Sequence, residues 1–301
     1  MHRDTQSLYR GTACPLRPAS AGSGQPRFRA LVSVPAILAI LAGLVGVPVT
    51  GTAADAGPGA SRVTAGPLVS RVTPGCQRTF VPAFPWSASL WTQAMDSRPA
   101  PGVMILNVTG VGAGNVPVPH FQALVRRAHA HGVTVLGYSS TEYGQRPPAA
   151  VEADARNYKA WYKANGMFLD LAAASRGELP YYRRLASYIR RVDRRSVIWL
   201  NPGAYPDQAY LQAGNVLVVF EGSYATYRGL QVPGWVAHYK AARFADVIYS
   251  TPGRDLAHAV RLARLRRAGY VYVTDLPGSP DPYSALPSYW TREVAAVAVR
   301  C

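Results

Sequence analysis

The sequence lacks the motifs that mark several large classes of enzyme. It has no Gly-x-Ser-x-Gly elbow of a serine hydrolase, and no His-Glu-x-x-His motif or close cysteine pair of a zinc enzyme. His129 and His131 are two residues apart on a predicted helix, so they face different directions. No glycine-rich phosphate loop follows the first apolar run, where Phe84-Pro85-Trp86-Ser87 stands instead. We therefore expect neither a metal nor another cofactor.

Charged residues are absent from a long segment near the N-terminus. Arg27 and Arg29 precede residues 30–49, which contain no charge, and small residues follow. This order is typical of a secretion signal, and Ala54-Asp55-Ala56 matches the small-x-small cleavage pattern. The alternative is an uncleaved anchor, because the run is long enough to span a bilayer. We expect residues 1–56 to be an export segment, and the remainder to be secreted or anchored in the membrane by residues 30–49.

Lysine is scarce, although the chain is strongly basic. The formal net charge is +16, with 32 Lys and Arg against 16 Asp and Glu, and the lysines are Lys159, Lys163 and Lys240 alone. Such an excess can bind nucleic acid, an acidic wall polymer or an anionic glycan. Because it is nearly all arginine and falls in pairs on or just past a predicted outer helix, we interpret it as coding bias. We expect no nucleic-acid partner.

Cysteine is scarce too, and its positions fit the division of the chain. Residues 57–75 are mostly small residues and proline, which is typical of a flexible linker, and the folded domain is expected over residues 76–301. Of three cysteines, Cys14 lies in the export segment, which leaves Cys76 and Cys301 at the two ends of the domain. In an oxidising compartment we expect these two to form a disulfide.

Eight short apolar runs alternate with longer stretches of helical periodicity. The runs, rich in Val, Ile and Tyr, cover residues 79–86, 102–108, 133–139, 167–171, 197–201, 216–221, 246–250 and 270–275. The helical stretches cover residues 120–131, 149–165, 180–192, 207–213, 235–244, 256–268 and 287–299. Eight predicted strands with interleaved helices in about 225 residues predict a (β/α)8 barrel, which we expect to be monomeric. A doubly wound open sheet is the alternative, and the missing phosphate loop disfavours it. In a barrel the first strand and last helix also bring Cys76 and Cys301 together.

Two carboxylates stand where strands of such a barrel should reach the pocket. Asp170 and Glu221 each end an apolar run, and active sites of this fold lie at the C-terminal ends of the strands. A buried carboxylate is costly unless it is paired or used, so the alternative to catalysis is a structural role beside an arginine or backbone donors. Two carboxyl groups facing one cleft suit glycoside cleavage, which needs one protonated and one ionised acid.

Further candidates for the pocket are polar and aromatic. Sugar rings have apolar faces that stack on aromatic side chains, and their hydroxyl groups need hydrogen-bond partners. The candidate sugar-binding residues are Trp86, Asn107, Tyr138, Thr141, Tyr143, Asn201, Tyr224 and Asp275.

At these same residues the sequence resembles the spherulation-specific family 4 (spherulin 4-like) proteins. The matching stretches are VPAFPW (81–86), GYSSTEYG (137–144), GMFLD (166–170), LNPG (200–203) and VFE (219–221). The five stretches occur along the chain in the same order as in the family and cover essentially the whole domain. The resemblance implies a (β/α)8 barrel with its acids at Asp170 and Glu221. It also implies an activity like that of fungal members, which cut α-1,4-linked N-acetylgalactosamine in galactosaminogalactan.

The chain departs from the family at the end of the fourth strand. The family commonly has Asp-Glu there, whereas this chain has Asp170-Leu171. The missing acid is either auxiliary, or replaced by Glu178, or its loss leaves a protein that binds glycan without cutting it. The first case predicts a secreted, retaining, endo-acting hydrolase of an amino-sugar polysaccharide, with Asp170 as nucleophile or stabiliser and Glu221 as acid/base, or the reverse. The last predicts a glycan-binding or envelope protein.

Overall fold

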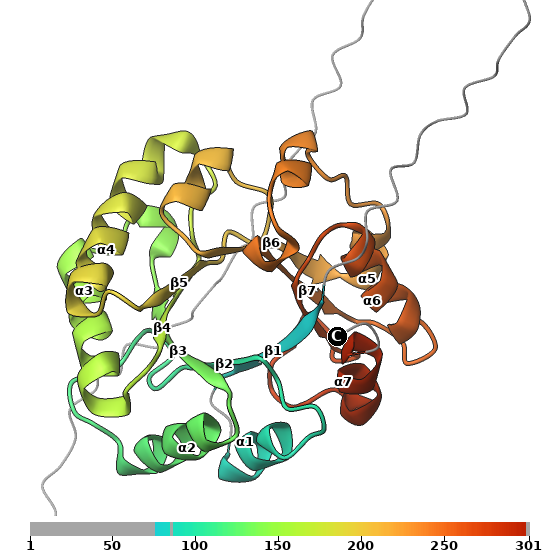
Figure 1. The fold of residues 1–301 in the computed structure, drawn as a ribbon, viewed down its shortest axis with the longest axis horizontal. Coiled ribbons are helices and arrows are strands. Elements are labelled where there is room, and N and C mark those ends of the chain that lie inside the picture. The colour runs from blue at the N-terminus through green and yellow to red at the C-terminus, as the bar shows by residue number, and fades with distance from the viewer. Residues whose placement is uncertain (1–75, 85–86, 299–301) are drawn as a thin grey trace, which may run out of the picture. The chain divides into compact units, whose positions relative to one another are not determined.

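Eight parallel strands close into a barrel, which confirms the predicted fold class. The computed structural model describes residues 76–84 and 87–298. Neighbours in the chain are neighbours in the sheet, and the strands form the ring seen in Figure 1. The ring closes where β1 pairs with β8, with Arg78 opposite Tyr270 and Thr79 opposite Val271. The strands are β1 (Arg78–Ala83), β2 (Val103–Leu106), β3 (Thr134–Ser140), β4 (Gly166–Asp170), β5 (Val197–Leu200), β6 (Val216–Ser223), β7 (Phe244–Tyr249) and β8 (Tyr270–Val273).

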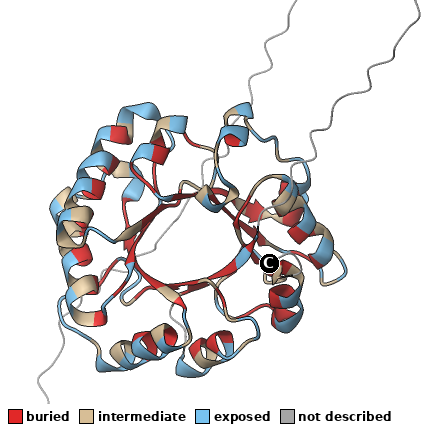
Figure 2. Cartoon of the chain, in the orientation of Figure 1, coloured by how far each residue is buried: buried red, intermediate tan, exposed pale blue. Residues whose placement is uncertain are grey.

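Helices surround the ring of strands on its outside (Figure 1). They are α1 (Ala88–Met95), α2 (Pro119–Ala130), α3 (Pro148–Asn157), α4 (Leu179–Val192), α5 (Tyr224–Arg228), α6 (Leu256–Leu265) and α7 (Trp290–Ala298). In α4, Tyr182, Leu185, Ala186 and Ile189 are buried, three or four residues apart, and form one apolar stripe. Figure 2 shows the same division around the ring, with buried residues facing the strands and exposed ones facing outward.

The outer layer is thinner than predicted on both sides of β6. The helix expected over residues 207–213 is a 3-10 helix at Gln208–Gln212. The one expected over residues 235–244 is two 3-10 helices, Gly234–His238 and Ala241–Arg243, because Tyr239 and Lys240 adopt extended backbone conformations between them. Two helices were not predicted. Ser87 caps one of them, α1, by accepting a hydrogen bond from the Leu90 N–H.

Aromatic side chains fill the inside of the barrel. The ring of Trp199 on β5 lies 5.2 Å from Phe80, 6.4 Å from Phe168 and 4.8 Å from Tyr270, measured between centroids. Alternate residues of a strand point to the same side, so Asp170 follows Phe168 into the barrel and Asn201 follows Trp199. The polar residues therefore lie one layer above an aromatic floor.

Several arginines hold the ends of outer elements, which gives the basic excess a structural role that its composition did not indicate. Arg243 donates to the carbonyl oxygens of Leu211 and Gly214, at and just past the end of the 3-10 helix Gln208–Gln212. Arg264 donates to two carbonyls near the end of α7, and Arg266 to two at the end of α5. The forked guanidinium can bind two such acceptors at once, and a lysine ammonium offers no such fixed geometry.

A buried acid on β7 predicts a pH-dependent stability. Asp246 is 1% exposed, accepts a hydrogen bond from the Tyr227 hydroxyl, and has its pKa raised to about 7 by burial, against the lowering effects of that bond and of Arg266. Because the folded pKa exceeds the unfolded one, the stability it contributes is present below about pH 4 and is lost as the pH rises to about 7. Replacing Asp246 with asparagine should raise the unfolding free energy at pH 8 by about 2–4 kcal/mol relative to the unmodified domain.

Urea unfolding at pH 4 and pH 8 measures this difference, which should vanish at pH 4. Asp96→Asn is the control for an exposed acid, because the Asp96 carboxylate pairs with Arg127 at 2.9 Å and its replacement should slightly lower, not raise, the unfolding free energy at pH 8. An equal effect of Asp246→Asn at both pH values would contradict the assignment.

Several expectations concern residues outside the described ranges. These are the export segment, the linker, Trp86 and Cys301, so the disulfide between Cys76 and Cys301 stays a prediction. Among the helices of the described part, none has the length and apolar character needed to cross a membrane.

Candidate active site

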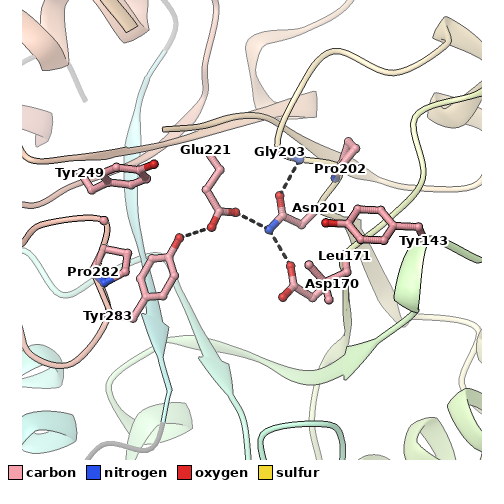
Figure 3. A pocket seen from close by; sticks show the side chains of 11 residues that line it. Tyr143, Asp170, Leu171, Asn201, Pro202, Gly203, Glu221, Tyr249, Pro282 and Tyr283 are labelled. Carbon is pink, nitrogen blue, oxygen red and sulfur yellow. Dashed lines mark hydrogen bonds between the residues drawn. The ribbon is translucent and has the colours of Figure 1, made fainter. Parts of the chain in front are cut away.

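A pocket of about 380 Å³ opens at the C-terminal end of the barrel, where the fold predicts a site. Figure 3 shows its two acids side by side, with an amide between them. None of its lining residues in the described part is Lys, Arg or His. The lining residues are Tyr143, Asp170, Leu171, Asn201, Pro202, Gly203, Glu221, Tyr249, Gly278, Pro282 and Tyr283.

Asn201 joins the two acids. Its Nδ2 donates one hydrogen bond to Oδ1 of Asp170 and another to Oε2 of Glu221, both 2.7 Å long. Its Oδ1 accepts the N–H of Gly203 at 3.0 Å, which orients the amide so that the nitrogen faces the acids. Gly203 has a φ of +65°, a conformation that favours glycine. The turn after β5 therefore fixes the bridge.

A tyrosine binds the outer oxygen of each acid. The Tyr138 hydroxyl donates to Oδ2 of Asp170 at 2.8 Å, and the Tyr283 hydroxyl donates to Oε1 of Glu221. The Phe84 ring packs edge-on against both tyrosines, with its centroid 5.0 Å from that of Tyr138 and 5.4 Å from that of Tyr283. Both carboxyl groups are thus held at both oxygens, as a preorganised site requires.

The two acids differ in their electrostatic surroundings. Burial raises the pKa of Asp170, but hydrogen bonds from Tyr138, from the Leu171 backbone and from Asn201 lower it. Burial also raises the pKa of Glu221, and the negative charge of Asp170 raises it further, against the hydrogen bonds of Asn201 and Tyr283. The repulsion between two neighbouring carboxylates is mutual, so the pair retains one proton. Because Asp170 accepts three hydrogen bonds and Glu221 only two, we assign the negative charge to Asp170 and the proton to Glu221.

The Asn201 bridge also limits the distance between the acids. Two oxygens that each lie 2.7 Å from one nitrogen are at most about 5.4 Å apart. Retaining glycosidases have carboxyl groups about 5–5.5 Å apart, and inverting ones about 6.5–9.5 Å, which leaves room for a water molecule. The spacing here matches a retaining geometry.

Among the predicted site residues, Tyr138, Tyr143, Asp170, Asn201 and Glu221 come together at the pocket. The others that the structure describes lie elsewhere. Thr141 donates to the Asp170 and Leu171 carbonyls behind the pocket, and Asn107 accepts the N–H of Gly110 in its own loop. Tyr224 bonds His258 between α5 and α6, and Asp275 accepts two hydrogen bonds from Ser288 before α7.

The loop between β8 and α7 supplies pocket residues that were not predicted. It contributes Gly278, Pro282 and Tyr283, and the end of β7 contributes Tyr249. Tyr249 closes an apolar run and so had a sequence signal, whereas Tyr283 lies well past the end of β8 and had none. Glu178, a possible substitute for the missing acid, is not a lining residue. Its carboxylate lies against the backbone of Gly144, so close that a Cβ atom added at Gly144 would be 2.9 Å from Oε2.

Within the described ranges, no three His, Cys, Asp or Glu side chains are grouped as metal ligands.

The barrel and its amide-bridged acids define the class, a (β/α)8 barrel with a carboxylate pair of the kind used in glycan cleavage. The sequence places the chain more narrowly. It belongs to the spherulation-specific family 4, whose profile matches residues 80–297.

Two known proteins are similar to this chain. Spherulin-4 of Physarum polycephalum is 28% identical over 233 residues, which cover 73% of this chain and 70% of that protein. The crystal structure of Aspergillus clavatus Sph3 in complex with GalNAc matches with a TM-score of 0.64 and 24% identity, over 74% of this chain and 97% of Sph3. The structural likeness supports the barrel fold.

Proposed function

We propose that the domain is a retaining glycoside hydrolase that cleaves a polysaccharide containing amino sugars, outside the cytoplasm. The observation that carries the proposal is the Asn201 bridge, which holds Asp170 and Glu221 at a retaining distance in an open pocket. Membership of the family supports the class of reaction, and the GalNAc bound by Sph3 supports an amino sugar as ligand.

In the proposed reaction each acid has one role in each step. The ionised Asp170 attacks the anomeric carbon while Glu221 donates its proton to the leaving glycosidic oxygen, which forms a glycosyl ester on Asp170. Glu221, now ionised, then takes a proton from a water molecule that attacks the same carbon and releases Asp170. Tyr138 and Asn201 hold the Asp170 carboxylate in place for both steps.

Leu171 favours the second candidate, a protein that binds glycan without cutting it. It stands where the family commonly has an acid, and Glu178 lies outside the pocket. The proposed reaction needs only two carboxyl groups, so we propose that the third acid is auxiliary.

The test is to incubate residues 76–301 with a panel of amino-sugar polysaccharides and to measure both new reducing ends and binding. Release of reducing ends with retained anomeric configuration, followed by NMR, supports the proposal. Binding without release supports the binding protein, and neither result with any member of the panel supports an envelope protein.

Tyr283 predicts a shift in the pH dependence of hydrolysis. Its hydrogen bond lowers the pKa of Glu221, so Tyr283→Phe should raise that pKa and move the basic limb of the kcat/KM profile to higher pH, by about one unit. Tyr249→Phe is the matched control, because Tyr249 lines the same pocket but is not among the groups that shift the pKa of Glu221. An unmoved basic limb in Tyr283→Phe would contradict the assignment of the proton to Glu221.

A further inference from the structure

Two exposed apolar side chains form one wall of the pocket. Tyr143 is 58% exposed and Leu171 is 39% exposed, although large apolar residues are otherwise mostly buried. Figure 3 shows both on the Asp170 side, whereas Tyr249, Pro282 and Tyr283 lie on the Glu221 side. The acids thus have an apolar surface beside them that the proposed reaction does not use.

The backbone holds this wall in an unusual conformation. Leu171 has a φ of +46° and Tyr143 a φ of +56°, in the left-handed region that side chains with a Cβ atom rarely adopt. The two residues are tied together, because the Tyr143 N–H donates to the Leu171 carbonyl at 2.7 Å. The Thr141 hydroxyl donates to the same carbonyl at 2.8 Å. Strained conformations that the surroundings enforce in this way are typical of ligand-binding sites.

The charges in the pocket limit what the wall can hold. Asp170 and Glu221 are its acids, and no basic side chain of the described residues lines it, in spite of the net charge of +16. An anionic sugar would face Asp170 without a cation to pair with. A sugar ammonium placed against Leu171 would lose its hydration and gain no acceptor from that side chain, and both oxygens of Asp170 already accept hydrogen bonds from Tyr138 and Asn201. An uncharged sugar can lay its apolar face on both residues.

We infer that Leu171 and Tyr143 form an apolar sugar-binding platform that selects an uncharged sugar residue beside the acid pair. The inference rests on the proposed function, because it takes the ligand to be a glycan. It makes Leu171 a specificity-determining residue, where an acid would give the wall a negative charge.

The test measures binding with Glu221→Gln as the background, so that no ligand is consumed. Calorimetry compares three probes of equal length: an N-acetylhexosamine oligomer, the same oligomer without its acetyl groups, and a uronic acid oligomer. Leu171→Asn keeps four side-chain heavy atoms branched at Cγ and tolerates the left-handed conformation, so it should raise Tm while it weakens binding of the uncharged oligomer about fivefold or more. Leu171→Glu should shift the preference toward the cationic oligomer at least about tenfold. Leu265→Asn is the control, because Leu265 is a 64% exposed leucine on α6.

The outcomes separate this inference from the proposed function. Unchanged affinity in Leu171→Asn, a preference of the background variant for a charged oligomer, or no binding of any probe would overturn the platform. If the unmodified domain releases reducing ends but Leu171→Asn binds normally, the platform fails and the hydrolase stands. If Leu171 governs binding but no reducing ends appear, the platform stands and the hydrolase fails.

Discussion

Asp170→Asn is expected to lower the rate of polysaccharide hydrolysis by about 10³-fold or more, whatever the leaving group. An amide cannot attack the anomeric carbon to form the glycosyl ester, so the loss falls on the first step. The same change removes the negative charge that raises the pKa of Glu221, so that pKa should fall. The basic limb of the pH profile of any residual activity should therefore move to lower pH. Initial rates of reducing-end release across the pH range measure both effects.

Glu178→Gln is the matched control for this prediction. Glu178 is an acid of the segment that follows β4, but it lies outside the pocket lining, so its amide should leave the rate within about twofold. If Glu178→Gln were as inactive as Asp170→Asn, Glu178 would be taking the place of the acid that the family commonly has at the position of Leu171. If Asp170→Asn kept most of its activity with an unchanged Tm, Asp170 would not be the nucleophile.

Glu221→Gln should have an effect that depends on the leaving group. A sugar oxygen needs a proton to leave, so hydrolysis of the polysaccharide should fall by about 10²–10⁴-fold. An aryl glycoside of an acidic phenol needs no such proton, and its first turnover should slow by less than about tenfold. The second step has then lost its base. The glycosyl ester should therefore accumulate on Asp170, where mass spectrometry of the intact protein and its peptides detects the added sugar.

Azide distinguishes this result from simple damage to the fold. It needs no base, so it should release the trapped sugar from Glu221→Gln as a glycosyl azide of retained configuration, and restore turnover. Asp170→Asn forms no ester, so any glycosyl azide it makes from the aryl glycoside should come from direct displacement and have inverted configuration. A loss of equal size on both types of substrate would instead assign Glu221 to a structural or binding role. Labelling of Glu221 in the Asp170→Asn variant would reverse the two roles.

The part of the site that could be predicted from the sequence is the part built on strand ends. Asp170, Asn201 and Glu221 each follow a short apolar run, and parallel strands of a barrel bring their ends to one face. Their mutual contacts could not be predicted, because which oxygen meets the Asn201 amide depends on the turn that places Gly203. Tyr224 was expected to bind sugar in the pocket. The structure continues β6 to Ser223 and begins α5 there, so the Tyr224 hydroxyl bonds His258 of α6 instead.

Residues from loops were beyond prediction for a different reason. Tyr283 reaches Glu221 from the connection between β8 and α7, and its ring packs near Phe84 of the first βα connection and Tyr272 of β8. This position depends on contacts between distant parts of the chain, which leave no period in the sequence. The 3-10 helices on either side of β6 also could not be predicted. Their sequences have an apolar pattern that fits a helix, but extended residues such as Lys240 interrupt it.

The closed ring of strands determines where a tether or a second domain can be attached to this domain. A second pocket, at the opposite end of the barrel from the acids, is lined by both Cys76 and Ala298, with Gly102 and Gly132 just before β2 and β3. The two ends of the described domain therefore meet on the face that the acids do not use. A tag, a surface tether or a partner domain fused at either end would leave the pocket mouth clear. The domain can thus be immobilised through both ends at once while a long polymer still has access to Asp170 and Glu221.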